Sequence, residues 1–236
     1  MPVSTNNTSD EAMPRVVALV PMRHYSERVP GKNYRPFAGL PLYHHIVTRL
    51  LACPLVTEVV VDTDSPVILK DAAKCFPEVR LIHRPEHLSS DTTPMNDVLL
   101  YDVTQVEADY YLQTHSTNPL IQIETIDRAL QQFMNNYPAY DSLFSVTRIQ
   151  TRLWDGLARP VNHNPAILLR TQDLPPVYME NSCLYIFTRD MLENRHNRIG
   201  DRPLLFEIDS IEAQDIDVET DFILAEILYK QRESLT

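Results

Sequence analysis

The chain has 236 residues, a formal net charge of −11 and 44% hydrophobic residues, which is enough apolar material for a substantial core. Its acidic balance argues against a protein that coats nucleic acid, because phosphate backbones are bound through broad basic surfaces. No apolar run approaches the length of a membrane span, so we expect neither nucleic-acid nor membrane partners.

The N-terminal segment is polar and lacks the apolar stretch of a signal peptide, so we predict a disordered tail over residues 1–14. The three cysteines, Cys53, Cys75 and Cys183, stand far apart and form no C-x-x-C spacing. An odd number of separated cysteines is a poor disulfide framework, which favours a reducing cytoplasm. Residues 15–236 are predicted to form one α/β domain.

Short β-branched runs alternate with helical patterns along this domain. Strands are predicted over Arg15–Val20, Glu58–Asp62, Val79–His83, Asp109–Gln113, Ser142–Thr147 and Cys183–Phe187. Helices are predicted over Leu42–Leu51, Ser65–Phe76, Thr93–Val106, Ile123–Met134 and Val218–Arg232. This alternation implies a mainly parallel, Rossmann-like sheet flanked by helices, whose ligands bind beyond the carboxyl ends of the strands.

The regular pattern breaks between residues 148 and 181, a stretch rich in proline and asparagine with little periodicity. We interpret it as an arm inserted into the domain, with a long loop as the alternative. Arms of this kind often serve dimer contacts, so we expect a small dimerisation arm and a homodimer.

The loop after the first predicted strand places Arg23, Arg28 and Lys32 within ten residues of an acidic chain. With a flexible Gly31 and free backbone amides, this loop suits a phosphate cradle. Arg23 would grip phosphate oxygens in a bidentate manner, and Lys32 would act as a point charge. Neither a Walker A nor a G-x-G-x-x-G pattern is present, and a solvated basic loop is the alternative.

Five stretches in register resemble the acylneuraminate cytidylyltransferase family, the CMP-sialic acid synthetases. In the first loop, Arg23-x-x-Ser26 followed by Pro30-x-Lys32-Asn33 is similar to the nucleotide-binding loop of that family. The other four, in chain order, are Arg84-Pro-Glu-His-Leu-Ser-Ser-Asp91-Thr92, Arg170-Thr-Gln172-Asp-Leu-Pro, Asn181-Ser-Cys-Leu-Tyr185-Ile and Gln214-Asp215-Ile-Asp217-Val-Glu219. The resemblance spans residues 16–227 and implies the fold of nucleotide-diphospho-sugar transferases.

This resemblance implies transfer of CMP from CTP to the anomeric hydroxyl of a 2-keto-3-deoxy sugar acid of the sialic acid type, with release of pyrophosphate. Such phosphoryl transfer depends mainly on positioning and on neutralising phosphate oxygens. The catalytic residues that it implies are Arg23, Lys32 and Asp217. The nucleotide-binding residues that it implies are Arg23, Ser26, Arg28, Lys32, Asn33, Arg84, Asp91 and Thr92.

Asp215 and Asp217 alternate along the chain, so their carboxylates face the same side of an extended segment. Paired carboxylates beside a triphosphate are hard oxygen ligands suited to Mg²⁺, and we predict that these two bind the divalent cation. The alternative is a helix cap, because the last predicted helix begins at Val218 and aspartate is favoured just before a helix.

For the acceptor sugar acid, the resemblance implies contacts from Gln113, His115, Arg170, Gln172, Asn181 and Tyr185. The stretch that ends at Pro119 has two more residues than the family segment, which leaves open whether Gln113 or His115 meets the sugar. Ile121 stands where the family usually has an arginine. An apolar residue cannot pair with a carboxylate, so we expect an acceptor orientation that differs from that in the common sialic-acid enzymes.

Two other functions are compatible with the sequence. The R-V-P-G-K run of the first loop resembles enzymes that activate Kdo, the eight-carbon relative, but their Q-G-D-E-P segment is missing. The second alternative is a catalytically silent relative that binds a nucleotide. The departures at Glu27, where a lysine is usual, and at Ile121 favour that alternative, whereas the retained cations and aspartates oppose it.

Overall fold

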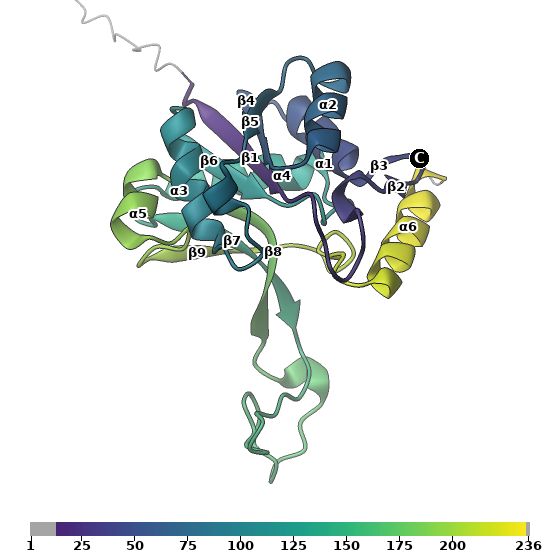
Figure 1. The fold of residues 1–236 in the computed structure, drawn as a ribbon. Coiled ribbons are helices and arrows are strands. Elements are labelled where there is room, and N and C mark those ends of the chain that lie inside the picture. Colours follow the sequence, from purple (N-terminus) through teal and green to yellow (C-terminus); the bar gives the residue numbers. More distant parts are fainter. Residues whose placement is uncertain (1–12, 235–236) are drawn as a thin grey trace, which may run out of the picture.

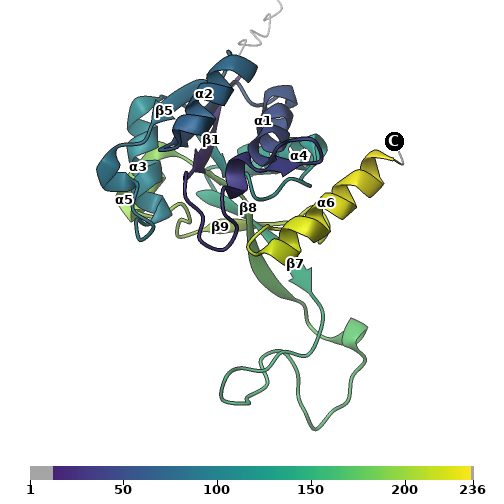
Figure 2. The same cartoon turned by 45° about the vertical axis from the view of Figure 1, so that its right-hand side comes forward.

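The computed structural model describes residues 13–234, so the predicted tail over residues 1–14 lies almost wholly outside the described part. Within residues 13–234 the chain forms a seven-stranded sheet with helices on both faces, and a long arm projects away from this body (Figure 1, Figure 2). The strands follow the spatial order β5-β4-β1-β6-β8-β7-β9.

The sheet is mainly parallel, as the sequence predicts. Its strands are β1 (Val16–Met22), β4 (Glu58–Thr63), β5 (Arg80–His83), β6 (Tyr110–Thr114), β7 (Ser142–Ile149), β8 (Val177–Phe187) and β9 (Pro203–Glu207). The neighbours β5, β4, β1 and β6 are parallel, β9 is parallel to β7, and β8 runs antiparallel to both of its neighbours. A small ribbon of β2 (Pro36–Phe37) and β3 (Leu40–Pro41) follows the first loop.

All seven residues of β1 are buried, as is typical of a strand that is covered on both faces. Val16, Ala18 and Val20 pack with the helices of one face, and Val17 and Leu19 pack with those of the other. The first face carries α1 (Leu42–Ala52), α2 (Pro66–Cys75) and α4 (Ile123–Asn136). The second face carries α3 (Met95–Gln105) and α5 (Arg189–Arg195).

The last helix, α6 (Glu219–Glu233), lies beside the sheet and packs through its own apolar cluster. Phe222 and Ala225 contact Leu120 and Phe37, and Ile216 is fully buried in the same cluster. Because Ile216 lies between Asp215 and Asp217, this cluster fixes the aspartate segment against the body. Short 3-10 turns occur at Lys32–Tyr34, Glu86–Leu88 and Thr171–Asp173.

Three features differ from the sequence prediction. The strands β7 and β8 continue into the predicted arm as a ribbon in which Ile149 pairs with Val177, so the irregular part covers residues 150–176. The helix α5 and the strand β9 were not predicted. The side chain of Thr188 caps α5 by accepting from the Met191 amide at 3.3 Å, but the helix has only seven residues and gives a weak periodic signal.

Among residues 13–234, no helix combines the length and the apolar character that crossing a membrane would require.

Candidate active site

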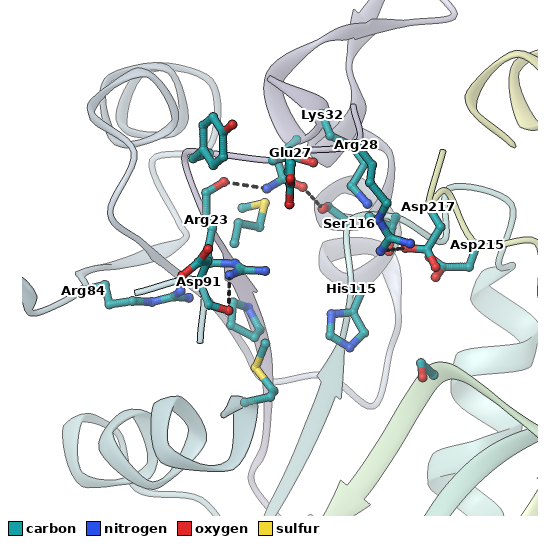
Figure 3. A pocket seen from close by; sticks show the side chains of 18 residues that line it. Arg23, Glu27, Arg28, Lys32, Arg84, Asp91, His115, Ser116, Asp215 and Asp217 are labelled. Carbon is teal, nitrogen blue, oxygen red and sulfur yellow. Dashed lines mark hydrogen bonds and ion pairs between the residues drawn. The ribbon is translucent and has the colours of Figure 1, made fainter. Parts of the chain in front are cut away.

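A cavity of about 480 Å³ opens at the carboxyl ends of β1, β5 and β6 (Figure 3). Most residues predicted to bind nucleotide or metal line it: Arg23, Ser26, Arg28, Lys32, Asn33, Arg84, Asp91, Asp215 and Asp217. Figure 3 shows one side formed by Arg23, Arg84 and Asp91, and the other by Arg28, Asp215 and Asp217. The structure therefore brings separate sequence motifs together at the sheet edge where α/β proteins bind ligands.

Hydrogen bonds fix the first loop so that its cations face the cavity. The Asn33 Nδ2 donates to the Arg23 carbonyl oxygen at 2.7 Å, and its Oδ1 accepts from the Ser116 hydroxyl at 2.7 Å. Asn33 therefore braces the loop from within. Gly31 has φ 66°, in the left-handed region that favours glycine, and a β carbon there would approach the Tyr34 ring to 2.9 Å.

Arg23 also reaches the segment that follows β5. Its Nη1 donates to the Asp91 carbonyl oxygen at 2.9 Å, which ties the first loop to that segment. Thr92, although predicted to bind the nucleotide, does not line the cavity, and its hydroxyl lies 2.9 Å from that of Ser90.

Arg28 and Lys32 face the two aspartates that the sequence assigns to a metal. The Lys32 Nζ donates to the carbonyl oxygen of Ile216, and the Arg28 Nη2 lies 2.8 Å from Asp217 Oδ1. Burial lowers the pKa of Lys32, an effect that the charges of Asp215 and Asp217 oppose. Burial raises the pKa of Asp215, and the nearby charge of Asp217 adds to the shift. Two like charges held this close favour a bound cation.

The start of α6 shows whether Asp217 caps this helix. The Asp221 Oδ2 accepts from the backbone nitrogens of Asp217 at 3.0 Å and Val218 at 2.9 Å. The carboxylate of Asp217 pairs with Arg28 instead. The capping alternative is therefore wrong, because Asp221 supplies the cap, and the metal role of Asp217 stays a prediction.

Arg84 is held at the cavity wall by a buried acidic pair. Its Nε lies 2.7 Å from Asp62 Oδ2, and each of the two side chains is 1% exposed. Asp102 on α3 is fully buried, and its carboxylate has no hydrogen-bond partner among the described residues. Burial, and then the charge of Asp62, raises the pKa of Asp102 to about 8. Arg84 thus pairs with Asp62 alone, and the raised pKa of Asp102 keeps a proton on this second carboxyl group at neutral pH.

The sequence leaves open whether Gln113 or His115 contacts the acceptor. In the structure His115 lines the cavity, whereas Gln113 is fully buried behind it. The Gln113 Nε2 lies 3.0 Å from the His115 Nε2. Burial lowers the pKa of His115 to about 3, and the charges of Arg198 and Lys32 act in the same direction. The imidazole is therefore neutral near pH 7.

Asn181 and Tyr185, both predicted to contact the acceptor, do not line the cavity. The Asn181 Oδ1 accepts from the Ser145 hydroxyl at 2.6 Å, and the Tyr185 hydroxyl donates to Glu180 and accepts from Ser182 Oγ at 3.1 Å. The pairing register of β7 and β8 shifts here, and Ser182 adopts φ 58°. Because of this irregularity the Ser182 side chain faces the cavity, whereas Asn181 and Tyr185 lie behind the cavity wall.

Arg170 and Gln172 lie on the projecting arm and not at the cavity of this chain. The Arg170 Nε bonds to Asp173 Oδ2 at 2.6 Å, and the Gln172 carbonyl oxygen accepts from Gln150 Nε2 at 2.7 Å. Both residues are exposed. Their predicted contact with an acceptor would require a second subunit.

The cavity also includes residues to which the sequence assigned no role: Pro21, Met22, Tyr25, Glu27, Met95, Ser116, Thr117 and Ser182. The hydroxyl groups of Ser116 and Thr117 directly follow His115, so their place after a predicted strand was the available signal. The position of Met95 depends on how α3 packs, which local sequence does not reveal.

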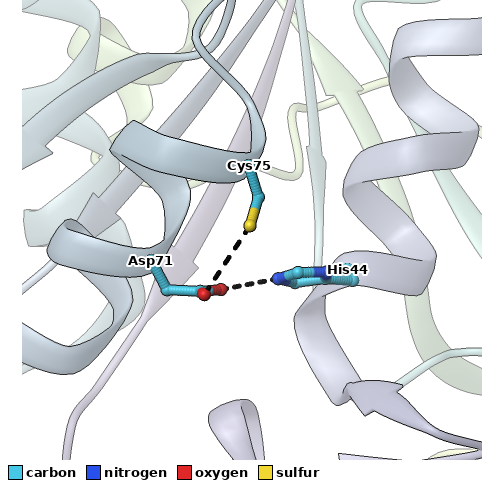
Figure 4. A group of neighbouring side chains, drawn as sticks. All are labelled: His44, Asp71 and Cys75. Carbon is cyan, nitrogen blue, oxygen red and sulfur yellow. Dashed lines mark hydrogen bonds and ion pairs between the residues drawn. The ribbon is translucent and has the colours of Figure 1, made fainter.

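A second group of side chains with metal-binding atoms lies between α1 and α2 (Figure 4). The His44 Nε2 lies 2.6 Å from Asp71 Oδ2, and the Cys75 Sγ lies 3.7 Å from Asp71 Oδ1. The Tyr43 hydroxyl also donates to Asp71 Oδ2 at 2.5 Å. Both oxygens of Asp71 already accept hydrogen bonds, so this group is a satisfied link between two helices.

Comparison with known proteins agrees with this geometry. A family model described as cytidylyltransferase matches residues 17–234. The chain is 31% identical to CMP-N,N'-diacetyllegionaminic acid synthase of Legionella pneumophila, over 91% of this chain and 96% of the relative. It is 27% identical to post-translational flagellin modification protein B of Campylobacter coli, over 93% of this chain and 97% of the relative.

A solved structure shares the fold. It is that of CMP:2-keto-3-deoxy-manno-octonic acid synthetase complexed with CTP, which aligns with a TM-score of 0.68 at 18% identity. The alignment covers 92% of this chain and 99% of the other.

Proposed function

The chain belongs to the acylneuraminate cytidylyltransferase family, and from this premise we propose that it transfers CMP from CTP to the anomeric hydroxyl of a 2-keto-3-deoxy sugar acid of the nonulosonic type. Members of the family are nucleotidyltransferases, and the chain is an enzyme of that class. The observation that carries the proposal is the cavity that Arg23, Arg28 and Lys32 line together with Asp215 and Asp217.

In the proposed reaction, the anomeric hydroxyl oxygen attacks the α-phosphorus of CTP. A phosphorus–oxygen bond forms to the sugar acid, whose hydroxyl proton passes to solvent, while the bond between the α-phosphorus and the oxygen bridging to the β-phosphate breaks and pyrophosphate leaves with that oxygen. Arg23 and Lys32 would neutralise the phosphate oxygens as charge develops on them, and the braced first loop would keep these cations in place without reorganisation. The backbone amides of the loop would add further donors.

The donor set of Asp215 and Asp217 fits a hard divalent cation such as Mg²⁺. Both are carboxylates that line the cavity, and the raised pKa of Asp215 reflects its burial and a neighbouring negative charge, which a cation would offset. When bound there, the cation would reduce the repulsion between the triphosphate and an anionic acceptor. Asp217 would exchange its ion pair with Arg28 for the metal, which would free Arg28 for the triphosphate.

The reaction is tested by incubating the protein with CTP and Mg²⁺ and a panel of N-acetylneuraminic acid, N,N'-diacetyllegionaminic acid and Kdo, with pyrophosphate release measured. We expect release with a nonulosonic acid. Arg23→Ala and Lys32→Ala should each lower kcat/KM by roughly a hundredfold or more, as the loss of a preorganised electrostatic group does. Arg35→Ala is the control, because Arg35 pairs with Glu219 outside the cavity. Unchanged turnover in both cavity variants would contradict the proposed site.

We also propose a homodimer built through the arm. The irregular part of the arm carries apolar side chains that are well exposed in the single chain: Trp154, Leu157, Val161, Ile167, Leu168 and Leu169. Leu168 is the most exposed of them, at 88%. Clusters of this kind on a soluble protein mark association surfaces. A second subunit would cover them and could bring Arg170 or Gln172 to the edge of a shared site.

Sedimentation velocity at micromolar concentration tests this assembly. The unmodified chain should sediment as a dimer, and Leu168→Asp should shift it toward the monomer. Val67→Asp provides the matched control, because Val67 is 45% exposed on α2 and lies outside the arm. An active monomer would refute the dimer.

A further inference from the structure

Arg198, in the loop between α5 and β9, is a half-buried cation without an ion-pair partner among residues 13–234. Its Nη1 donates to the Gln113 Oε1 at 2.6 Å, and its guanidinium carbon lies 3.5 Å from the centre of the Tyr185 ring. The nearest acidic influence comes from Glu180, whose carboxylate accepts from the Tyr185 hydroxyl. The partners of Arg198 are thus an amide and an aromatic face.

Arg198 does not itself line the cavity, but three separate contacts connect it to residues at the cavity wall. Gln113, its amide partner, is in contact with His115, which lines the cavity. Tyr185, on which it stacks, accepts a hydrogen bond from the hydroxyl of Ser182, another lining residue. In the third contact, the Arg198 backbone nitrogen donates to Asn96 Oδ1 at 3.2 Å. Asn96 follows Met95, a residue of α3 that lines the cavity.

The side chains in contact with the Arg198 guanidinium, those of Gln113 and Tyr185, are uncharged at neutral pH, and Glu180 contacts it only through Tyr185. The pKa of His115 is lowered to about 3 by burial, and burial raises the pKa of Tyr185 to about 12. Burial also lowers the pKa of Arg198 itself, which shows that the site does not compensate its charge fully. A partly buried charge without a counter-ion is costly, and such groups concentrate where a ligand supplies the missing charge.

The carboxylate of the acceptor is the ligand charge for which the sequence offers no partner. The acceptor of the proposed reaction carries a carboxylate, and Ile121 stands where the family usually has an arginine. In the structure Ile121 is fully buried in the core that α1 and α4 form, so it cannot reach the cavity. Of the cations that line the cavity, Arg23 donates to the segment that follows β5, and Arg28 and Lys32 contact the aspartate segment.

We propose that Arg198 binds the carboxylate of the acceptor sugar acid and so selects acids over neutral sugars. The inference rests on the proposed function. The planar guanidinium offers paired donors that match a carboxylate. Gln113 would act as a positioning residue: its Oε1 accepts from Arg198 while its Nε2 points toward His115, so it sets the guanidinium plane and the orientation of the imidazole.

The test compares an acid with its own uncharged ester. Calorimetric titration in the presence of α,β-methylene CTP, which cannot release pyrophosphate, gives the affinity for N-acetylneuraminic acid, N,N'-diacetyllegionaminic acid and Kdo. The methyl ester of the acid that binds most tightly is then titrated. We expect the unmodified protein to prefer the acid by roughly ten- to a hundredfold, the size of a hydrogen bond to a charged group. Arg198→Gln should abolish this preference, because it should weaken the binding of the acid and leave the binding of the ester unchanged.

Two further variants make the result specific. Arg198→Lys keeps the charge but not the paired donors, and should retain part of the preference. Arg195→Gln is the matched control, because Arg195 lies three residues earlier and pairs with Asp201 on the surface at 2.8 Å; it should retain the full preference. If Arg198→Gln does not fold in a thermal melt, the Arg198→Lys variant decides: a reduced preference supports the inference and an unchanged preference overturns it.

The outcomes separate this inference from the proposed function. A folded Arg198→Gln protein that still prefers the acid overturns the inference, even if the unmodified protein releases pyrophosphate from CTP. A preference that depends on Arg198 without pyrophosphate release in a parallel assay with CTP leaves the inference standing and removes the proposed function. Failure of the unmodified protein to distinguish acid from ester overturns the inference.

Discussion

Two pairs of aspartates with similar chemistry lie in opposite surroundings. Asp215 and Asp217 line the cavity, where Arg28 and Lys32 reach them from the first loop. Asp62 and Asp102 are buried in the body, with Arg84 between β5 and the cavity as their only cation within residues 13–234.

The difference lies in how each pair is neutralised. In the buried pair, an arginine compensates one carboxylate and a proton occupies the other, so no charge is left to offer. In the cavity pair, the compensating cations come from the braced but solvent-facing first loop and can be redirected when a ligand arrives. We therefore expect the buried pair to contribute to stability and the cavity pair to contribute to ligand binding.

The largest expected effect comes from breaking the buried pair. Arg84→Leu leaves the Asp62 carboxylate buried without a cation, which typically costs about 3–5 kcal/mol of folding free energy. For a chain of this size the melting temperature should fall by roughly 10 °C. Arg80→Leu is the control, because Arg80 lies on β5, four residues before Arg84, but bonds to Glu58 near the surface. Equal melting of the two variants would show that the Asp62–Arg84 contact does not stabilise the fold.

The second effect separates function from stability in the cavity pair. Asp217→Asn should lower kcat roughly a hundredfold, as the loss of an electrostatic group does, and leave the melting temperature nearly unchanged. Asp221→Ala should do the reverse: it removes the α6 cap at a cost of about 1 kcal/mol and keeps turnover. If Asp217→Asn had a lower melting temperature and retained activity, Asp217 would stabilise the fold and would not take part in catalysis.

The third effect concerns the proton on Asp102. The folded protein keeps this proton up to about pH 8, whereas the unfolded chain loses it near the ordinary aspartate value of about pH 4. The folded state binds more protons in this window, so the contribution of Asp102 to the free energy of unfolding decreases as the pH rises from 4 to 8. Asp102→Asn removes this decrease. Its melting temperature, relative to the unmodified protein, should therefore rise more at pH 8 than at pH 5; parallel curves would contradict a protonated Asp102.

The fold was largely predictable because its core strands are continuous apolar runs between helix signals. The predicted strand Arg15–Val20 corresponds to β1 (Val16–Met22), in which every residue is buried. The short α5 and β9 escaped prediction because seven- and five-residue elements carry little periodic signal. Most of the cavity was predictable for a related reason: residues that directly follow parallel strands meet at one edge of the sheet.

The remaining site residues depend on contacts that local sequence cannot encode. Arg198 meets Gln113 across 85 positions of the chain, and only packing of the α5 loop brings them together. The turn of Ser182 into the cavity follows from a register shift in β8, which also directs Asn181 away from it. Asp102 lies on a helix, where aspartate ordinarily indicates an exposed face, and its burial was not foreseen.

The most direct test of the central claim follows the reaction by phosphorus NMR. The protein is incubated with CTP, Mg²⁺ and the nonulosonic acid that gives turnover in the panel. Attack at the α-phosphorus predicts that the three CTP signals are replaced by one phosphodiester signal and one pyrophosphate signal in equal molar amounts, and that Lys32→Ala slows this conversion. The appearance of CDP and inorganic phosphate, or unchanged CTP with every acid of the panel, would contradict it.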